Sequence, residues 1–69
     1  MTQAERIMDY LERNGSITPL EAMNELGIMR LGARIFDLKE QGVKIITERV
    51  KAENRHGEVT SFARYRLEN

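Results

Sequence analysis

The stretch ITPLEAMNELGIMRL, residues 17–31, predicts a short helix, a turn and the start of a second helix. Thr18 stands where an N-cap is expected, and Pro19 follows at the first helical position, where its missing N–H costs nothing. Glu21, three residues after Thr18, completes a capping box. Gly27 supplies the positive φ that ends a helix. Two helices joined by a short turn that contains Gly are typical of a helix-turn-helix, whose second helix commonly enters a DNA groove.

A first helix is predicted before this stretch, at about Gln3–Arg13. Thr2 and Glu5 stand three residues apart and form a second capping box at its start. Its apolar residues recur at helical spacing and define one face: Ala4, Ile7, Met8 and Leu11. Gly15 ends this helix, and residues 16–17 follow as a short extended link.

The second helix is expected at Pro19–Leu26 and the third at about Met29–Gln41, with residues 27–28 as the turn between them. Apolar residues at helical spacing predict one buried stripe on each helix. These stripes are Leu20, Met23 and Leu26 on the second helix, and Leu31, Ile35 and Leu38 on the third. Phe36 lies between the two faces of the third helix and is expected in the core or at an interface rather than against a ligand.

The periodicity changes after Gly42. Residues 43–51 and 59–67 are rich in β-branched residues, which predicts two strands. Residues 52–58 form a polar turn between them. In the second strand, three residues alternate with three others on the opposite face. The first set is Ala63, Tyr65 and Leu67, and the second is Phe62, Arg64 and Arg66.

Three helices followed by a β-hairpin are the element order of a winged helix-turn-helix, an α+β fold. The helix-turn-helix would occupy about residues 19–41 and the wing about residues 44–67. A chain of 69 residues allows one domain, at residues 1–69.

Several short segments resemble a family of small winged helix-turn-helix proteins encoded by phages and prophages. They are SITPLEA (16–22), LGIMRL (26–31), ARI (33–35), DL (37–38) and FARYRL (62–67). The resemblance implies a winged-helix fold and DNA binding. Gly32 departs from the family pattern, in which Ala or Ser is typical, and Gly within a helix costs roughly 0.5–1 kcal/mol relative to Ala. This Gly predicts either a looser third helix or a close approach of its backbone to another group.

The net charge is zero, but the charges are unevenly distributed. Residues 1–27 carry two cations and five anions, whereas residues 28–69 carry nine cations and six anions. Eight of the eleven cations are Arg, which suits bidentate contact with phosphate and guanine. The basic excess therefore accompanies the third helix and the hairpin. The alternative is an ordinary solvated surface of mixed charge.

Nine residues are candidates for DNA contact: Thr18, Met29, Arg30, Ala33, Arg34, Arg49, Lys51, Arg55 and His56. Arg30 and Arg34, one turn apart on the third helix, would reach base edges or phosphates, and their neighbours Met29 and Ala33 would touch a thymine methyl. Thr18 would offer phosphate the N-terminus of a helix, in addition to capping it.

The hairpin candidates would lie over a flanking minor groove or backbone, where Arg is favoured. Alternatively, these charges prevent edge-to-edge association of the hairpin. His56 also fits an ordinary loop residue, and Glu53 and Glu58 dilute the positive charge at the tip. Arg64 and Arg66 are expected to be solvated or salt-bridged on the outward face.

Catalysis, cofactors and metals are not expected, because the chain has no Cys, one His and no glycine-rich phosphate loop. No apolar run approaches the roughly 20 residues of a membrane span, and no signal peptide is recognisable, so we expect a cytoplasmic protein without a membrane partner.

Two functions remain open. The first is double-stranded DNA binding, as a transcriptional regulator or an excisionase-like recombination factor, with a homodimer or tandem sites providing affinity. The second is a protein-interaction module, such as a phage inhibitor of a host defence complex, which would bind a host or phage protein. The zero net charge and the acidic residues 1–27 favour this second reading.

Overall fold

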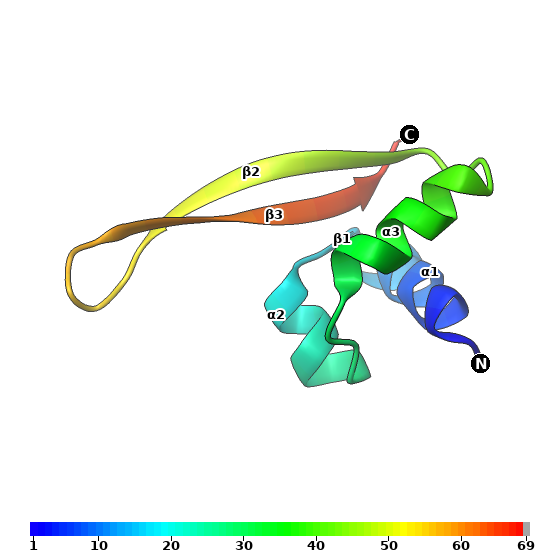
Figure 1. The fold of residues 1–69 in the computed structure, drawn as a ribbon, viewed down its shortest axis with the longest axis horizontal. Helices are drawn as coiled ribbons and strands as arrows, with labels where there is room; N and C mark the ends of the chain where they lie inside the picture. The colour runs from blue at the N-terminus through cyan, green and yellow to red at the C-terminus, as the bar shows by residue number, and fades with distance from the viewer. Residues whose placement is uncertain (69) are drawn as a thin grey trace.

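The computed structural model describes residues 1–68, so Asn69, the last residue of the predicted domain, lies outside the described residues. The elements run in the order α1 (Gln3–Asn14), β1 (Ser16–Ile17), α2 (Pro19–Glu21), η1 (Ala22–Leu26), α3 (Leu31–Glu40), β2 (Ile45–Glu53) and β3 (Val59–Leu67). The helices pack together, and the β2–β3 hairpin extends well beyond them (Figure 1). The predicted α+β architecture of helices followed by a hairpin wing is confirmed.

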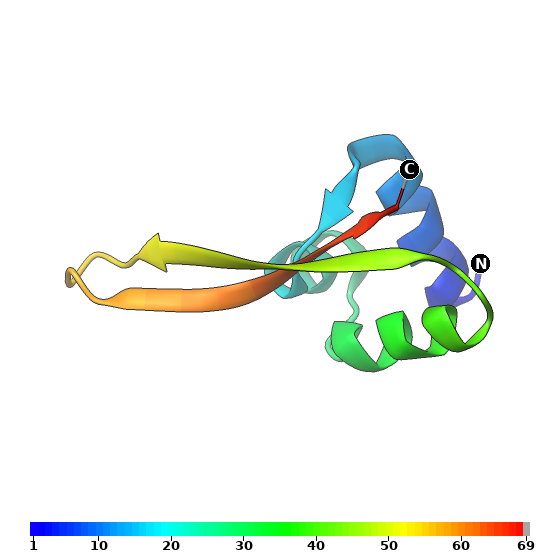
Figure 2. The same ribbon diagram turned by 90° about the horizontal axis from the view of Figure 1, so that it is seen from above.

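The sheet has three antiparallel strands in the order β1-β3-β2. The β2–β3 ladder runs from the pair Ile45–Leu67 at its base to the pair Glu53–Val59 near its tip. The predicted extended link, residues 16–17, is a third strand, because Ser16 pairs with Arg66 and Ile17 with Tyr65. Figure 2 shows β1 beside the base of the hairpin, on the opposite side from α3.

The core lies between the helices and the base of the sheet. Its nine buried residues are Ile7, Leu11, Ile17, Ala22, Ile28, Leu31, Ile35, Leu38 and Ile45. Tyr65 and Leu67 pack against it from β3, so one face of the sheet base covers the core. Burying each large aliphatic side chain contributes about 1.5–3 kcal/mol. The predicted stripes of the first and third helices are confirmed.

Both predicted capping boxes are present, at Thr2 with Glu5 and at Thr18 with Glu21. The backbone N–H of Thr2 donates to Glu5 Oε1 at 2.9 Å, and this bond lowers the pKa of Glu5. Gly15 and Gly27 follow α1 and η1 in the left-handed conformation, with φ of 88° and 68°. The local signals that delimit the first two helices are therefore confirmed, with α1 one residue longer than predicted, ending at Asn14.

The predicted buried stripe of the second helix is correct for Leu26, which packs against the core, and wrong for Leu20 and Met23. Leu20 is 62% exposed and Met23 is 44% exposed, while Ala22 is fully buried. The prediction followed a spacing of three residues, whereas Ala22 and Leu26, four residues apart, define the buried side. The segment widens into a π-helix at Ala22–Leu26, where the N–H of Gly27 reaches back to the carbonyl of Ala22.

The third helix starts two residues later than predicted. Arg30 is its N-cap, with φ −119° and ψ 61°, and its side chain makes no capping hydrogen bond. Met29 therefore belongs to the turn, and the helix begins at Leu31, where the chain enters the core. Its other end is Glu40, one residue short of the prediction.

The first strand of the hairpin is also displaced from its predicted range. The N–H of Val43 donates to the carbonyl of Leu38 at 3.0 Å, so residue 43 belongs to the end of α3 rather than to the ladder. Strand β2 begins at Ile45 and continues to Glu53, which reduces the predicted turn to residues 54–58.

Gly32 provides a test of helix energetics. A Cβ at this position would lie 3.7 Å from the Tyr65 hydroxyl, which is an ordinary contact. Among residues 1–68, no group therefore approaches the backbone of Gly32 so closely that glycine is required. We expect Gly32→Ala to raise the free energy of unfolding by about 0.5–1 kcal/mol, because Ala restricts the unfolded chain. Urea denaturation measures this change. Gly27→Ala is the matched control and should destabilise, since its φ is +68°. A less stable Gly32→Ala would contradict the explanation.

Candidate nucleic-acid interface

Helix α3 has one side that neither the sheet nor α1 covers. Its buried stripe faces the core, and Lys39 on its sheet side donates from Nζ to Thr47 Oγ1 at 3.3 Å. The residues away from the core, three and four positions apart, form one stripe. We call this stripe the outward face of α3: Ala33, Phe36, Asp37 and Glu40.

Phe36 is the large side chain of this outward face. It is 61% exposed, so the prediction of a core position is wrong, while its alternative, an interface position, stays a prediction. Met29, in the turn before α3, is 80% exposed. The start of α3 thus presents apolar side chains to solvent beside the polar ones. The helical spacing of Phe36 relative to the buried stripe is the signal that could have placed it there.

Arg30 and Arg34 lie together at the start of α3. They line a hollow of about 310 Å³ with Gln3, Gly27 and Met29. Arg34 Nη2 lies 3.3 Å from Asp37 Oδ2, and both side chains are about half exposed, so the ion pair is weak. Among the described residues, no carboxylate forms an ion pair with Arg30.

Arg49 and Lys51 extend from this region along β2. Side chains alternate along a strand, so both share the face of Ile45 and Thr47, on which the helices pack. Their cross-strand partners are Ala63 and Ser61, which are small and uncharged. Both cations are exposed, and within residues 1–68 neither makes an ion pair. Arg49 and Lys51 therefore form a short basic row on β2, which begins two residues after Thr47, the residue that contacts α3.

The loop at the tip of the hairpin is organised by Asn54. Its Oδ1 accepts hydrogen bonds from the N–H groups of His56 at 2.9 Å and Glu58 at 3.0 Å. Gly57 adopts a φ of 78°, which completes the tight turn. The tip lies at the far end of the hairpin from the helices (Figure 1), so Arg55 and His56 are not brought together with the α3 candidates.

On the opposite face of the hairpin, one glutamate pairs with two arginines. Glu48 Oε1 lies 3.6 Å from Arg64 Nε and 3.2 Å from Arg66 Nε. The salt-bridged role expected for these two arginines is confirmed. Arg49 and Lys51 lie on the other face, on which the helices pack, and strand alternation places Glu53 after them on the same face.

Thr18 serves as a cap. Its Oγ1 accepts the N–H of Glu21 at 3.2 Å, and Glu21 Oε1 accepts the N–H of Thr18 at 2.9 Å. A carboxylate therefore already occupies this helix N-terminus, and its charge opposes a phosphate. Phosphate contact at Thr18 stays a prediction that this geometry disfavours.

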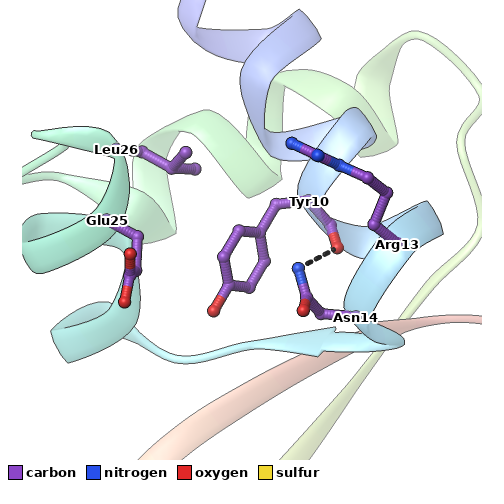
Figure 3. A pocket seen from close by; sticks show the side chains of 5 residues that line it. All are labelled: Tyr10, Arg13, Asn14, Glu25 and Leu26. Atoms are coloured by element: carbon purple, nitrogen blue, oxygen red, sulfur yellow. Dashed lines mark hydrogen bonds between the residues drawn. The ribbon is translucent and has the colours of Figure 1, made fainter.

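A larger hollow, about 420 Å³, lies between α1 and η1 and is lined by Tyr10, Arg13, Asn14, Glu25 and Leu26 (Figure 3). Burial raises the pKa of Tyr10, and the negative charges of Glu21 and Glu25 raise it further. Tyr10 is thus a neutral phenol beside carboxylates, an environment unsuited to a polyanion. Among residues 1–68, no cluster of three His, Cys, Asp or Glu side chains is arranged to hold a metal ion.

The raised pKa of Tyr10 makes stability depend on alkaline pH. The stabilising contribution is fully present below the ordinary value of 10.0 and is lost as pH rises through the folded-state pKa. We expect the melting temperature to fall more steeply above about pH 10 in the native protein than in Tyr10→Phe. Circular dichroism melts across this range measure the difference. Parallel profiles for the two proteins would show that the phenol is not perturbed.

The element order, the helix-turn-helix packed on a shared core and the protruding hairpin define a winged helix-turn-helix protein. Residues 2–69 match the family described as winged helix-turn-helix domain, and the chain belongs to this family. Such domains are typically non-enzymatic modules, and membership suggests binding of double-stranded DNA. No curated protein and no solved structure shows significant similarity to the chain. No described helix has the length and apolar character needed to cross a bilayer.

Proposed function

We propose that this protein binds double-stranded DNA with a sequence preference. The start of α3 and the preceding turn, with Met29, Arg30, Ala33 and Arg34, would enter the major groove. The β2–β3 wing would lie on the flanking backbone or minor groove. The observation that carries the proposal is the row of exposed cations, Arg49 and Lys51, on the face of the wing that continues α3.

The number of available cations indicates modest affinity for a single copy. Arg30, Arg49, Lys51 and Arg55 would neutralise about four phosphates, which predicts a slope of about −3.6 for log affinity against log salt. Glu53 and Glu58 near the tip reduce the local positive field. We therefore propose that a homodimer, or binding to tandem sites, supplies the remaining affinity.

The biological role we propose is that of a phage-type transcriptional regulator or an excisionase-like recombination factor, acting on DNA in the cytoplasm. Support comes from the short segments that resemble phage and prophage proteins, SITPLEA and FARYRL among them. The long wing also suits a protein that shares a DNA segment with neighbouring copies, because it extends the contact beyond one major groove.

The salt dependence of binding tests the role of the wing. We expect the double variant Arg49→Ala, Lys51→Ala to reduce the salt slope from about −3.6 to about −1.8, because two phosphate contacts are lost. Fluorescence anisotropy with labelled duplex DNA at several salt concentrations measures the slope. Arg13→Ala is the matched control, since Arg13 lies on α1 and pairs with Asp9 at 2.7 Å. The proposal fails if no duplex binds at low salt, or if the double variant keeps the slope of the native protein.

A protein-interaction role is the second candidate, favoured by the exposed apolar residues Leu20 and Met23. They stand beside the acidic Glu25 on α2 and η1. For this function, one host protein should be captured in stoichiometric amounts after nuclease treatment, and capture should be lost in the variant Leu20→Ser, Met23→Ser. Capture that is lost after nuclease treatment would instead mean that the two proteins were bound to the same DNA.

A further inference from the structure

The outward face of α3 differs in chemistry from a basic DNA-reading surface. Asp37 and Glu40 are the charged residues of this face, and Ala33 and Phe36 are its apolar ones. The two cations of α3 are both engaged, Lys39 with Thr47 Oγ1 at 3.3 Å and Arg34 with Asp37 at 3.3 Å. This face therefore offers few donors for guanine, and its most exposed large side chain is aromatic.

The apolar exposure at this face favours a partner that removes it from water. Phe36 is 61% exposed, and Met29 just before the helix is 80% exposed. Burial of aromatic and thioether side chains away from water lowers the free energy. In the major groove the apolar group is the C5-methyl of thymine, which distinguishes A·T and T·A pairs from the others.

Helix α3 is attached to the wing next to Arg49 and Lys51. The Lys39–Thr47 hydrogen bond joins α3 to β2, and Arg49 and Lys51 follow Thr47 on the same strand face. Figure 2 shows α3 alongside the base of the hairpin. A DNA backbone bound by Arg49 and Lys51 would therefore place the adjacent groove against α3. The carboxylates of Asp37 and Glu40 repel phosphate, so this face contributes selection rather than general attraction.

We propose that Phe36, with Met29 and Ala33 beside it, makes this protein select duplexes by their thymine methyl groups. The inference rests on the proposed DNA binding and adds the feature of the DNA that α3 recognises. The wing provides salt-dependent affinity for any duplex. Phe36 provides discrimination that depends little on salt, because burial of a methyl group releases no counterions.

Substitution of deoxyuridine for thymidine tests this directly, because it removes the methyl group and keeps base pairing and the hydrogen-bonding edges. A preferred duplex would first be selected with the full chain from a random library. Each thymidine in it would then be replaced in turn. We expect affinity to fall about threefold to tenfold for each methyl group that Phe36 or Met29 buries. The ratio of the affinities for the thymidine and deoxyuridine duplexes should stay constant as the salt concentration is raised.

Variants separate this role from general binding. Phe36→Ala should bind the thymidine and deoxyuridine duplexes equally, with an unchanged salt slope. Phe36 is exposed, so the variant should melt at the temperature of the native protein. Val59→Ala, which truncates another exposed apolar residue (70% exposed) on the wing, should keep the discrimination.

Three outcomes would overturn the inference. Equal affinity for both duplexes at every position would show that no methyl group is read. Undiminished discrimination in Phe36→Ala would assign the methyl contact to another residue. Sequence-independent binding that Phe36→Ala does not change would show that Phe36 does not contact DNA, and a protein contact would then be its remaining role. The proposed DNA binding survives all three, and it falls only if no duplex binds.

Discussion

The pairing of β1 with β3 is the constraint on which the rest of the structure depends. It joins Ser16 and Ile17, before the helix-turn-helix, to Arg66 and Tyr65 at the end of the chain. Ile17 is fully buried beneath this pairing, so the strand is both hydrogen-bonded and anchored in the core. Because β3 also carries the whole ladder to β2, the direction of the wing relative to α3 follows from these two residues. The packing of Ile45, Tyr65 and Leu67 at the core fixes the base of the hairpin together with this pairing.

One carboxylate on the outer face of the wing pairs with two arginines. Glu48 lies between Arg64 and Arg66, although each exposed ion pair adds only about 0.2–1 kcal/mol to stability. Arg49 and Lys51 have small cross-strand neighbours and stay available on the other face. A chain with zero net charge can in this way present a localised basic row, since attraction of a polyanion depends on where charges cluster.

The α3 region and the wing make separate contributions to recognition in this arrangement. Cations on the wing act at a distance and weaken with salt, whereas contacts at α3 need close apposition and depend on shape. Phe36 depends on tertiary packing for its position. Its position in the sequence indicated a residue between two faces, and only the packing of Leu31, Ile35 and Leu38 into the core showed which side it occupies.

Capping boxes, glycines and periodicity act within a few residues, so the amino-acid sequence was enough to predict the element types and most helix ends. It also predicted the core stripes of α1 and α3 and the alternation of β3. It could not predict the π-helical turn at Ala22–Leu26, the exposure of Leu20, the strand at residues 16–17, or the N-cap at Arg30. Only the tertiary structure decided these, together with the faces of Arg34 and Lys51. Strand pairing and core packing join residues that are distant in sequence, and no signal within a few residues specifies such contacts.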